Sequence, residues 1–201
     1  MRTAFLALAL IAAPAVAQMP TTPPGAPDPA RAVAGTYKVD SGHTQVLFTV
    51  NHMGFSEYTG QFVEPTGTLV LDPKNAANDK VDIIFPIAKV MTTVAALNAH
   101  LQKPEFFDAA KFPEGHFVST KVTVSGTSAT IAGNLTLKGV TKPVVLNARF
   151  VGAGSNFMTK KAAIGFAATT TIKRSDFGIS YGIPLVTDEV KLTINAAFDQ
   201  Q

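Results

Sequence analysis

Hydrophobic and polar residues alternate along most of the chain beyond residue 43, which is the pattern of β-strands with one buried face. In residues 44–52 the even positions Val46, Phe48 and Val50 are apolar, whereas the positions between them are mostly polar. Segments rich in β-branched residues repeat this arrangement and are separated by turn-forming residues. The pattern predicts eight strands, at about 44–52, 58–72, 80–91, 115–125, 128–138, 142–152, 161–173 and 188–200.

Eight strands, each with one apolar face, suit a sheet that closes on itself. A single twisted sheet must cover its apolar face, and closure does this while also leaving no exposed edge strand. We therefore predict an all-β fold with minor α content: an eight-stranded antiparallel β-barrel with one or two short helices. A sandwich of two sheets fits the same alternation.

One segment, residues 93–102, breaks the β pattern. Val94, Leu97 and Leu101 have helical spacing, and Thr93 is a residue type that can cap a helix start. The residue before a proline is biased out of the α region, so this helix is expected to stop ahead of Pro104. A second short helix is expected over 104–110, with the proline in its first position. Both helices would close one end or side of the barrel.

The same alternation predicts which side chains face the interior. An eight-stranded barrel is just wide enough either to be filled by side chains or to hold one small ligand. Periodicity leaves both readings open, although the small residues of 163–168 would leave room if they faced inward. The predicted interior residues are Val46, Phe48, Val50, His52, Leu69, Ile83, Phe85, Ile164, Phe166, Leu192 and Ile194.

The wording of residues 133–143, GNLTLKGVTKP, resembles the G-x-LT-x-x-GVTKPV signature of the YceI-like family of periplasmic polyisoprenoid-binding proteins. Further matches occur in the family's order and span nearly everything from residue 35 to the end. They include Tyr37-x-x-Asp40-x-x-His43, Val46-x-Phe48-x-Val50-x-His52, Gly60-x-Phe62, His100-Leu101, Phe106-Phe107-Asp108, Arg174-Ser-Asp-Phe-Gly178 and Asp188-Glu-Val190.

This resemblance implies a lipocalin-like barrel that carries a lipid. The implied ligand is a long-chain isoprenoid, such as a quinone or a polyprenyl phosphate, held without covalent chemistry and with no other cofactor. By analogy, the ligand's head group would sit at a polar rim, for which His100, Arg174 and Asp176 are the candidates. An alternative for Arg174 and Asp176 is an ion pair that only stabilises their loop.

The N-terminus has the pattern of a secretory signal peptide. Arg2 precedes an apolar run that ends in the small residues Ala15-Val-Ala17. Residues 1–17 are therefore expected to direct export to the periplasm and to be removed. Residues 18–34, rich in proline and alanine, are interpreted as an extended linker or disordered leader, and 35–201 as one barrel domain.

Charge and composition limit the classes of partner that the protein is expected to bind. The net charge is +3, and no concentrated Lys/Arg tract argues for nucleic acid. This mild positive bias is compatible with transient contact with a membrane surface. The chain contains no cysteine, which excludes disulfides and thiol catalysis.

Two patterns could indicate an enzyme or a metal site. Gly178-Ile-Ser-Tyr-Gly182 fits the G-x-S-x-G motif of hydrolases, but Pro184 blocks the helix that must follow and no histidine lies downstream. The four histidines, His43, His52, His100 and His116, lack the spacing of a compact metal motif. We therefore predict no catalytic residues and no metal site. The alternatives are an enzyme acting on isoprenoid lipids and a ligand-free barrel with a stress or interaction role.

Overall fold

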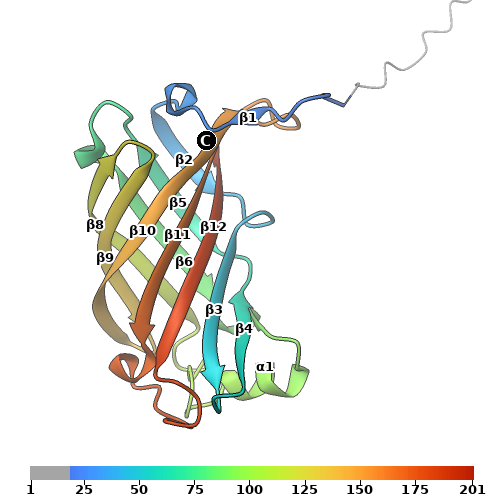
Figure 1. The fold of residues 1–201 in the computed structure, drawn as a ribbon, viewed down its shortest axis with the longest axis vertical. Helices are drawn as coiled ribbons and strands as arrows, with labels where there is room; N and C mark the ends of the chain where they lie inside the picture. Colours follow the sequence, from blue (N-terminus) through green and yellow to red (C-terminus); the bar gives the residue numbers. More distant parts are fainter. Residues whose placement is uncertain (1–18) are drawn as a thin grey trace, which may run out of the picture.

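The computed structural model describes residues 19–201. They form an elongated barrel with α1 at one end and the C-terminus at the other (Figure 1). The strands are β1 (Gly25–Ala26), β2 (Gly35–Val39), β3 (Gln45–His52), β4 (Ser56–Phe62), β5 (Thr66–Leu71), β6 (Lys80–Pro86), β7 (Val90–Met91), β8 (Glu114–Ser125), β9 (Ser128–Leu137), β10 (Val140–Ser155), β11 (Ala162–Lys173) and β12 (Glu189–Gln200). The helices are α1 (Ala95–Leu101) and the 3₁₀ turns η1 (Pro29–Arg31), η2 (Ala76–Asn78), η3 (Ile87–Lys89) and η4 (Arg174–Phe177).

The sheet closes into a ring of eight antiparallel strands. The order around the ring is β10–β9–β8–β6–β5–β2–β12–β11, and β11 pairs again with β10. At the end near α1, β12 pairs with β3 instead of β2. There β4 pairs with β3, and the short strand β7 pairs with β4. The predicted eight-stranded barrel is confirmed. Because the ring is closed, the alternative of a two-sheet sandwich is excluded.

Local backbone geometry divides strands that the alternation predicted as continuous. The predicted strand 58–72 is interrupted between β4 and β5, where Glu64 has φ 57° and Pro65 follows. A proline cannot donate to the strand ladder, and left-handed backbone is rare in strands, so the pairing stops here. The alternation also missed β2, which is too short to show a clear period.

The helical content is smaller than predicted. Helix α1 covers Ala95–Leu101, and its N-cap position is Val94 rather than Thr93. The expected second helix over 104–110 is not formed, because its amides turn back onto the end of α1 instead of continuing a helix. Phe107 N donates to Leu101 O at 3.1 Å, and the Asp108 φ of 50° is incompatible with a helix.

The N-terminal part of the described chain runs along one end of the barrel. β1 pairs with β10, with Gly25 opposite Gly154. A Cβ atom at Gly154 would overlap the carbonyl oxygen of Pro24, so only glycine permits this approach. Within the predicted linker, residues 24–34 therefore have defined contacts with the barrel, whereas the predicted signal peptide lies outside the described residues.

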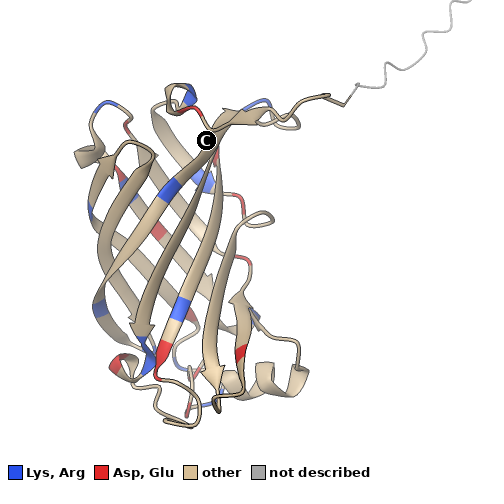
Figure 2. Ribbon diagram, viewed as in Figure 1, with Lys and Arg blue, Asp and Glu red and all other residues tan. Residues whose placement is uncertain are grey.

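The buried side chains form two groups along the barrel. One includes Phe62, Phe85 and Phe117, and it extends towards α1. The other surrounds Tyr37 and Phe198, nearer the C-terminus. Charged residues of both signs are spread over the outer wall and the connecting loops (Figure 2). Between residues 19 and 201, no helix has the length and apolar character needed to cross a membrane.

Candidate ligand-binding cavity

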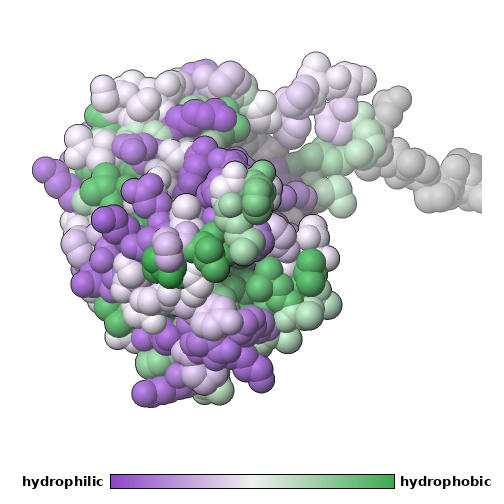
Figure 3. All heavy atoms as spheres, turned by 60° about the horizontal axis from the view of Figure 1, so that its bottom comes forward, coloured by the Kyte–Doolittle hydropathy of each residue, from purple (hydrophilic) through white to green (hydrophobic). Residues whose placement is uncertain are grey.

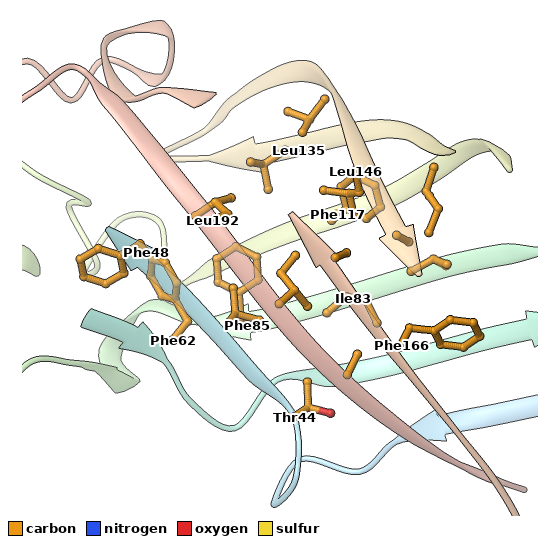
Figure 4. A pocket seen from close by; sticks show the side chains of 18 of the residues that line it. Thr44, Phe48, Phe62, Ile83, Phe85, Phe117, Leu135, Leu146, Phe166 and Leu192 are labelled. Atoms are coloured by element: carbon orange, nitrogen blue, oxygen red, sulfur yellow. The ribbon is translucent and has the colours of Figure 1, made fainter. Parts of the chain in front are cut away.

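The barrel encloses a cavity of about 950 Å³ that extends from the α1 end towards the C-terminal end. Its lining is overwhelmingly apolar, and Figure 4 shows aromatic and aliphatic side chains from several strands around this space. The interior is thus hollow rather than filled. Every predicted interior side chain lines the cavity: Val46, Phe48, Val50, His52, Leu69, Ile83, Phe85, Ile164, Phe166, Leu192 and Ile194. Their contact with a ligand stays a prediction.

Glycines on neighbouring strands make room for the aromatic rings. Phe48 lies opposite Gly60 in the β3–β4 pair, and Phe85 lies opposite Gly115 in the β6–β8 pair. A Cβ atom on either glycine would overlap the facing ring. Because the rings lie over bare backbone, they stay close to the wall instead of filling the centre of the barrel.

The small residues of β11 contribute less space than the sequence suggested. Ala168 lines the cavity, but Ala163, Gly165 and Ala167 do not, since they alternate with the inward-facing Ile164 and Phe166. The glycines opposite phenylalanines were missed by sequence reasoning. A glycine inside a predicted strand indicates a close approach by a neighbouring group. Only the strand register shows which aromatic ring that glycine faces.

Aromatic contacts close the cavity wall near α1. The Phe62 ring centroid lies 5.5 Å from that of Phe48 and 4.9 Å from that of Phe85. Phe107, from the turn after α1, packs edge-on against Phe62 at 5.6 Å. The 93–110 segment therefore packs against this end of the barrel, as predicted, although its second part is not helical.

His100, one of the predicted rim residues, does lie at the α1 end of the cavity. Its ring centroid is 4.9 Å from that of Phe106 and 5.4 Å from that of Tyr181. Its Nε2 lies 2.9 Å from Glu105 Oε1. The Glu105 pKa is lowered, first by a hydrogen bond from its own backbone amide and then by His100. This end of the cavity thus combines aromatic rings with a few polar atoms.

Arg174 also lines the cavity, but its donors are used by the protein. Its Nε donates to Thr187 O, its Nη1 to Ile179 O and Tyr181 O, and its Nη2 to Val186 O, at 2.7 to 3.2 Å. Burial lowers the Arg174 pKa. The guanidinium therefore holds the 179–187 loop in place, and it is not free to bind a ligand head group.

Asp176 does not line the cavity, contrary to its prediction as a rim residue. It lies beside an external groove with Lys142 and Lys173. It forms no ion pair with Arg174 either. The carboxylate that organises this turn is Asp188, which accepts hydrogen bonds from the Ser175 amide at 2.8 Å and the Ser175 hydroxyl at 2.7 Å. The η4 turn separates Arg174 from Asp176, because one side chain points inward and the other outward.

The G-x-S-x-G segment lacks the surroundings of a hydrolase nucleophile. Ile179 and Tyr181 line the cavity, whereas the Ser180 between them is exposed and outside the lining. The loop continues into β12 without a helix. Among residues 19–201 the Ser180 hydroxyl has no hydrogen bond to a histidine, and no three metal-ligating side chains gather in one place.

The fold and the cavity define a class of protein: lipocalin-like barrels that enclose an apolar space. A model of the YceI-like domain matches residues 37–198, and the chain belongs to the YceI-like family. Protein YceI of Salmonella arizonae is 41% identical over 172 residues, which cover 85% of this chain and 90% of that protein. Protein YceI of Salmonella paratyphi B matches equally well. The resemblance read from the sequence is thus confirmed.

Solved structures show the same barrel. The Campylobacter jejuni YceI protein is 30% identical with a TM-score of 0.67, over 75% of this chain and 90% of that one. Burkholderia cenocepacia BcnA has a TM-score of 0.72 at 23% identity, over 79% of this chain and 98% of that one. A polyisoprenoid binding domain from Saccharophagus degradans has a TM-score of 0.60 at 15% identity, over 82% and 98%. The last two likenesses concern the fold alone.

Proposed function

We propose that this protein binds a long-chain isoprenoid in the barrel cavity and stores or transports it in an aqueous compartment. The observation that carries the proposal is the apolar cavity of about 950 Å³. Ligand cavities usually measure roughly 300 to 1,000 Å³, so this one is at the large end. Burying apolar groups contributes about 0.8 kcal/mol per CH₂, so about ten such groups supply the roughly 8 kcal/mol of micromolar binding before ordering costs are subtracted, and a longer prenyl tail offsets those costs.

The electrostatics of the lining favour an uncharged head group. Arg174 is the one Lys or Arg residue along the described cavity wall, and four of its hydrogen bonds go to backbone carbonyls. A phosphate that entered this space would lose water without meeting a free cation, which is strongly unfavourable. A quinone-like head therefore suits the cavity better than a polyprenyl phosphate.

The head group is assigned to the α1 end. His52, Tyr58 and His100 line the cavity there, and they can offer hydrogen bonds to a carbonyl or hydroxyl. Between the two ends of the cavity the wall is formed mainly by aliphatic and phenyl groups, which suit a prenyl tail. No covalent step is needed for reversible enclosure, so the proposal assigns no catalytic residue.

We also propose export to the periplasm, on the basis of the signal-peptide pattern in residues 1–17. Removal of this segment would leave Gln18 as the first residue. Mass spectrometry of the protein recovered from the periplasm should find that N-terminus, and a chain that still begins with Met1 would contradict the proposal.

The binding test uses two substitutions of the same kind on opposite faces of β11. Ala168→Phe places a ring in the cavity, whereas Ala167→Phe adds one outside the cavity lining. We expect organic extracts of the parent protein and of Ala167→Phe to contain a long-chain isoprenoid, and extracts of Ala168→Phe to contain much less. Purified parent protein that contains no such lipid, and that takes up neither a long-chain quinone nor a polyprenol, would disprove the proposed function.

A further inference from the structure

Three chain segments meet around the α1 end of the cavity: the β3–β4 turn, helix α1 with its N-cap Val94, and the loop between η4 and β12. Met53 N donates to Leu185 O at 2.7 Å, and Thr187 N donates to Asn51 O at 3.1 Å, which joins the first segment to the third. The Tyr181 ring lies against His100, which joins the third to the second. Segments distant in sequence thus form one continuous border.

This border exposes large hydrophobic side chains to solvent. Their exposed fractions range from 37% for Ile183 to 89% for Phe55. Figure 3 shows this end of the molecule, where hydrophobic residues gather near the middle and hydrophilic residues surround them. Contiguous exposed apolar groups commonly mark an interaction surface. We call this surface the apolar rim, and it consists of Met53, Phe55, Val94, Tyr181, Ile183 and Leu185.

The charge distribution points to the chemistry of what covers the rim. Residues 50–56, 90–102 and 177–187 contain no Lys, Arg, Asp or Glu. Charges of both signs, including Glu57, Lys103, Glu105 and Asp176, lie just beyond these segments in the sequence. An uncharged centre flanked by mixed charges complements a zwitterionic bilayer, whose apolar interior lies beneath head groups that carry both signs. Docking to an anionic surface would instead call for clustered Lys or Arg.

We propose that the apolar rim docks the α1 end of the barrel onto a zwitterionic lipid bilayer, so that the ligand moves between bilayer and cavity without crossing water. The rim is continuous with the cavity, since Val94 and Tyr181 belong to both. Aromatic side chains such as Phe55 and Tyr181 suit the interfacial region. The docking rests on the rim alone, whereas the transfer of ligand also rests on the proposed function.

The absence of tryptophan from the chain allows a direct measurement of docking. A single Leu185→Trp substitution places a fluorophore on the rim, and Val145→Trp places one on the outer wall of β10, where the side chain is also exposed. With phosphatidylcholine vesicles we expect a blue shift of the rim fluorophore and its quenching by brominated lipid. The wall fluorophore should show neither. Equal responses, or no response from the rim, would overturn the proposal.

A second measurement, vesicle flotation, avoids adding a tryptophan that could itself favour membrane binding. Flotation with phosphatidylcholine vesicles should be weakened roughly tenfold or more in the double variant Phe55→Glu/Leu185→Glu, because charges replace apolar contacts. The matched variant Val145→Glu/Val151→Glu should float like the parent protein. Equal flotation of all three proteins would overturn the proposal, as would parent binding that requires anionic lipid and disappears at high salt.

Two further readouts separate this inference from its alternatives. Binding of a short-chain, water-soluble quinone should be unchanged in the rim double variant, whereas loading of a long-chain quinone from vesicles should be slower. If the parent protein docked on vesicles but bound no quinone, only the proposed function would be refuted. A dimer in analytical ultracentrifugation that depends on Phe55 and Leu185, without vesicle binding, would assign the rim to a second copy and overturn the proposal.

Discussion

The ring of Phe48 covers the backbone of Gly60, which it faces directly across the β3–β4 pair. The absence of a side chain on one strand thus determines where the largest side chain of its neighbour lies. The ring stays at the wall, 5.5 Å from the Phe62 ring, and the centre of the barrel remains open. Cavity volume in this barrel therefore depends on glycines as much as on the residues that line it.

Gly60→Ala should push the Phe48 ring into the cavity, because the new methyl group takes the space that the ring now occupies. If the ring displaces about two methylene groups of the ligand tail, affinity for a long-chain quinone should fall roughly tenfold. Gly165→Ala is the control, since its added Cβ atom would meet neighbours no closer than 3.7 Å. Titration of both variants with the same quinone checks the prediction, and equal affinities would contradict it.

Phe48→Ala should destabilise the free protein by less than a comparable change in a packed core. Truncating a tightly packed phenylalanine costs roughly 3 to 5 kcal/mol, but one side of Phe48 already faces open space. A long-chain quinone should raise the melting temperature of the parent and of the variant, because it binds only the folded state. The shift in the variant should be at least as large if the tail fills the vacated space. No shift in either protein would indicate that the cavity does not bind this lipid.

Arg174→Lys should destabilise the fold by roughly 2 to 4 kcal/mol, because a single ammonium group cannot reach the carbonyls of Ile179, Tyr181, Val186 and Thr187 together. Asp176→Asn is the matched control and should leave stability nearly unchanged. Urea unfolding of the two variants provides the measurement. If Arg174→Lys left the free energy of unfolding unchanged, the guanidinium would not organise this loop.

The Ser175–Asp188 contact should make part of the stability depend on pH. Hydrogen bonds from Ser175 hold the Asp188 pKa below its ordinary value of 3.8. A lowered pKa in the folded state contributes stability above the unfolded-state pKa, and this contribution is lost as the pH falls through the folded-state pKa. Ser175→Ala should therefore be less stable than the parent near pH 7, and the difference should shrink below about pH 4. A difference that stays constant down to pH 2 would argue against this coupling.

Ser180→Ala should leave the fold and quinone binding unchanged, because Ser180 is exposed and does not line the cavity. Melting temperature, quinone titration and hydrolysis of a model ester would be compared for parent and variant. An esterase activity that is present in the parent and lost in the variant would contradict the non-enzymatic interpretation.

The strand alternation predicted most of the strands and their inward faces, whereas the choice of a barrel over a sandwich also rested on the family resemblance. Val46, Phe48 and Val50 share one face because successive side chains in a strand point to opposite sides. All predicted interior residues line the cavity for this reason. Local pattern was less reliable for helices, because the segment after Pro104 forms turns through its hydrogen bonds with the end of α1.

Only the tertiary structure decided that the barrel is hollow, what Arg174 does and where the exposed apolar residues gather. The ring of Phe85 finds space over Gly115, which is thirty residues away in sequence and is brought opposite by the β6–β8 register. The partners of Arg174 are backbone carbonyls, which every residue type possesses, so no motif could identify them. The apolar rim joins three loops whose proximity comes from closure of the sheet. Alternation is a property of neighbouring residues, whereas ring placement, carbonyl contacts and loop convergence depend on strands that are paired across long sequence separations.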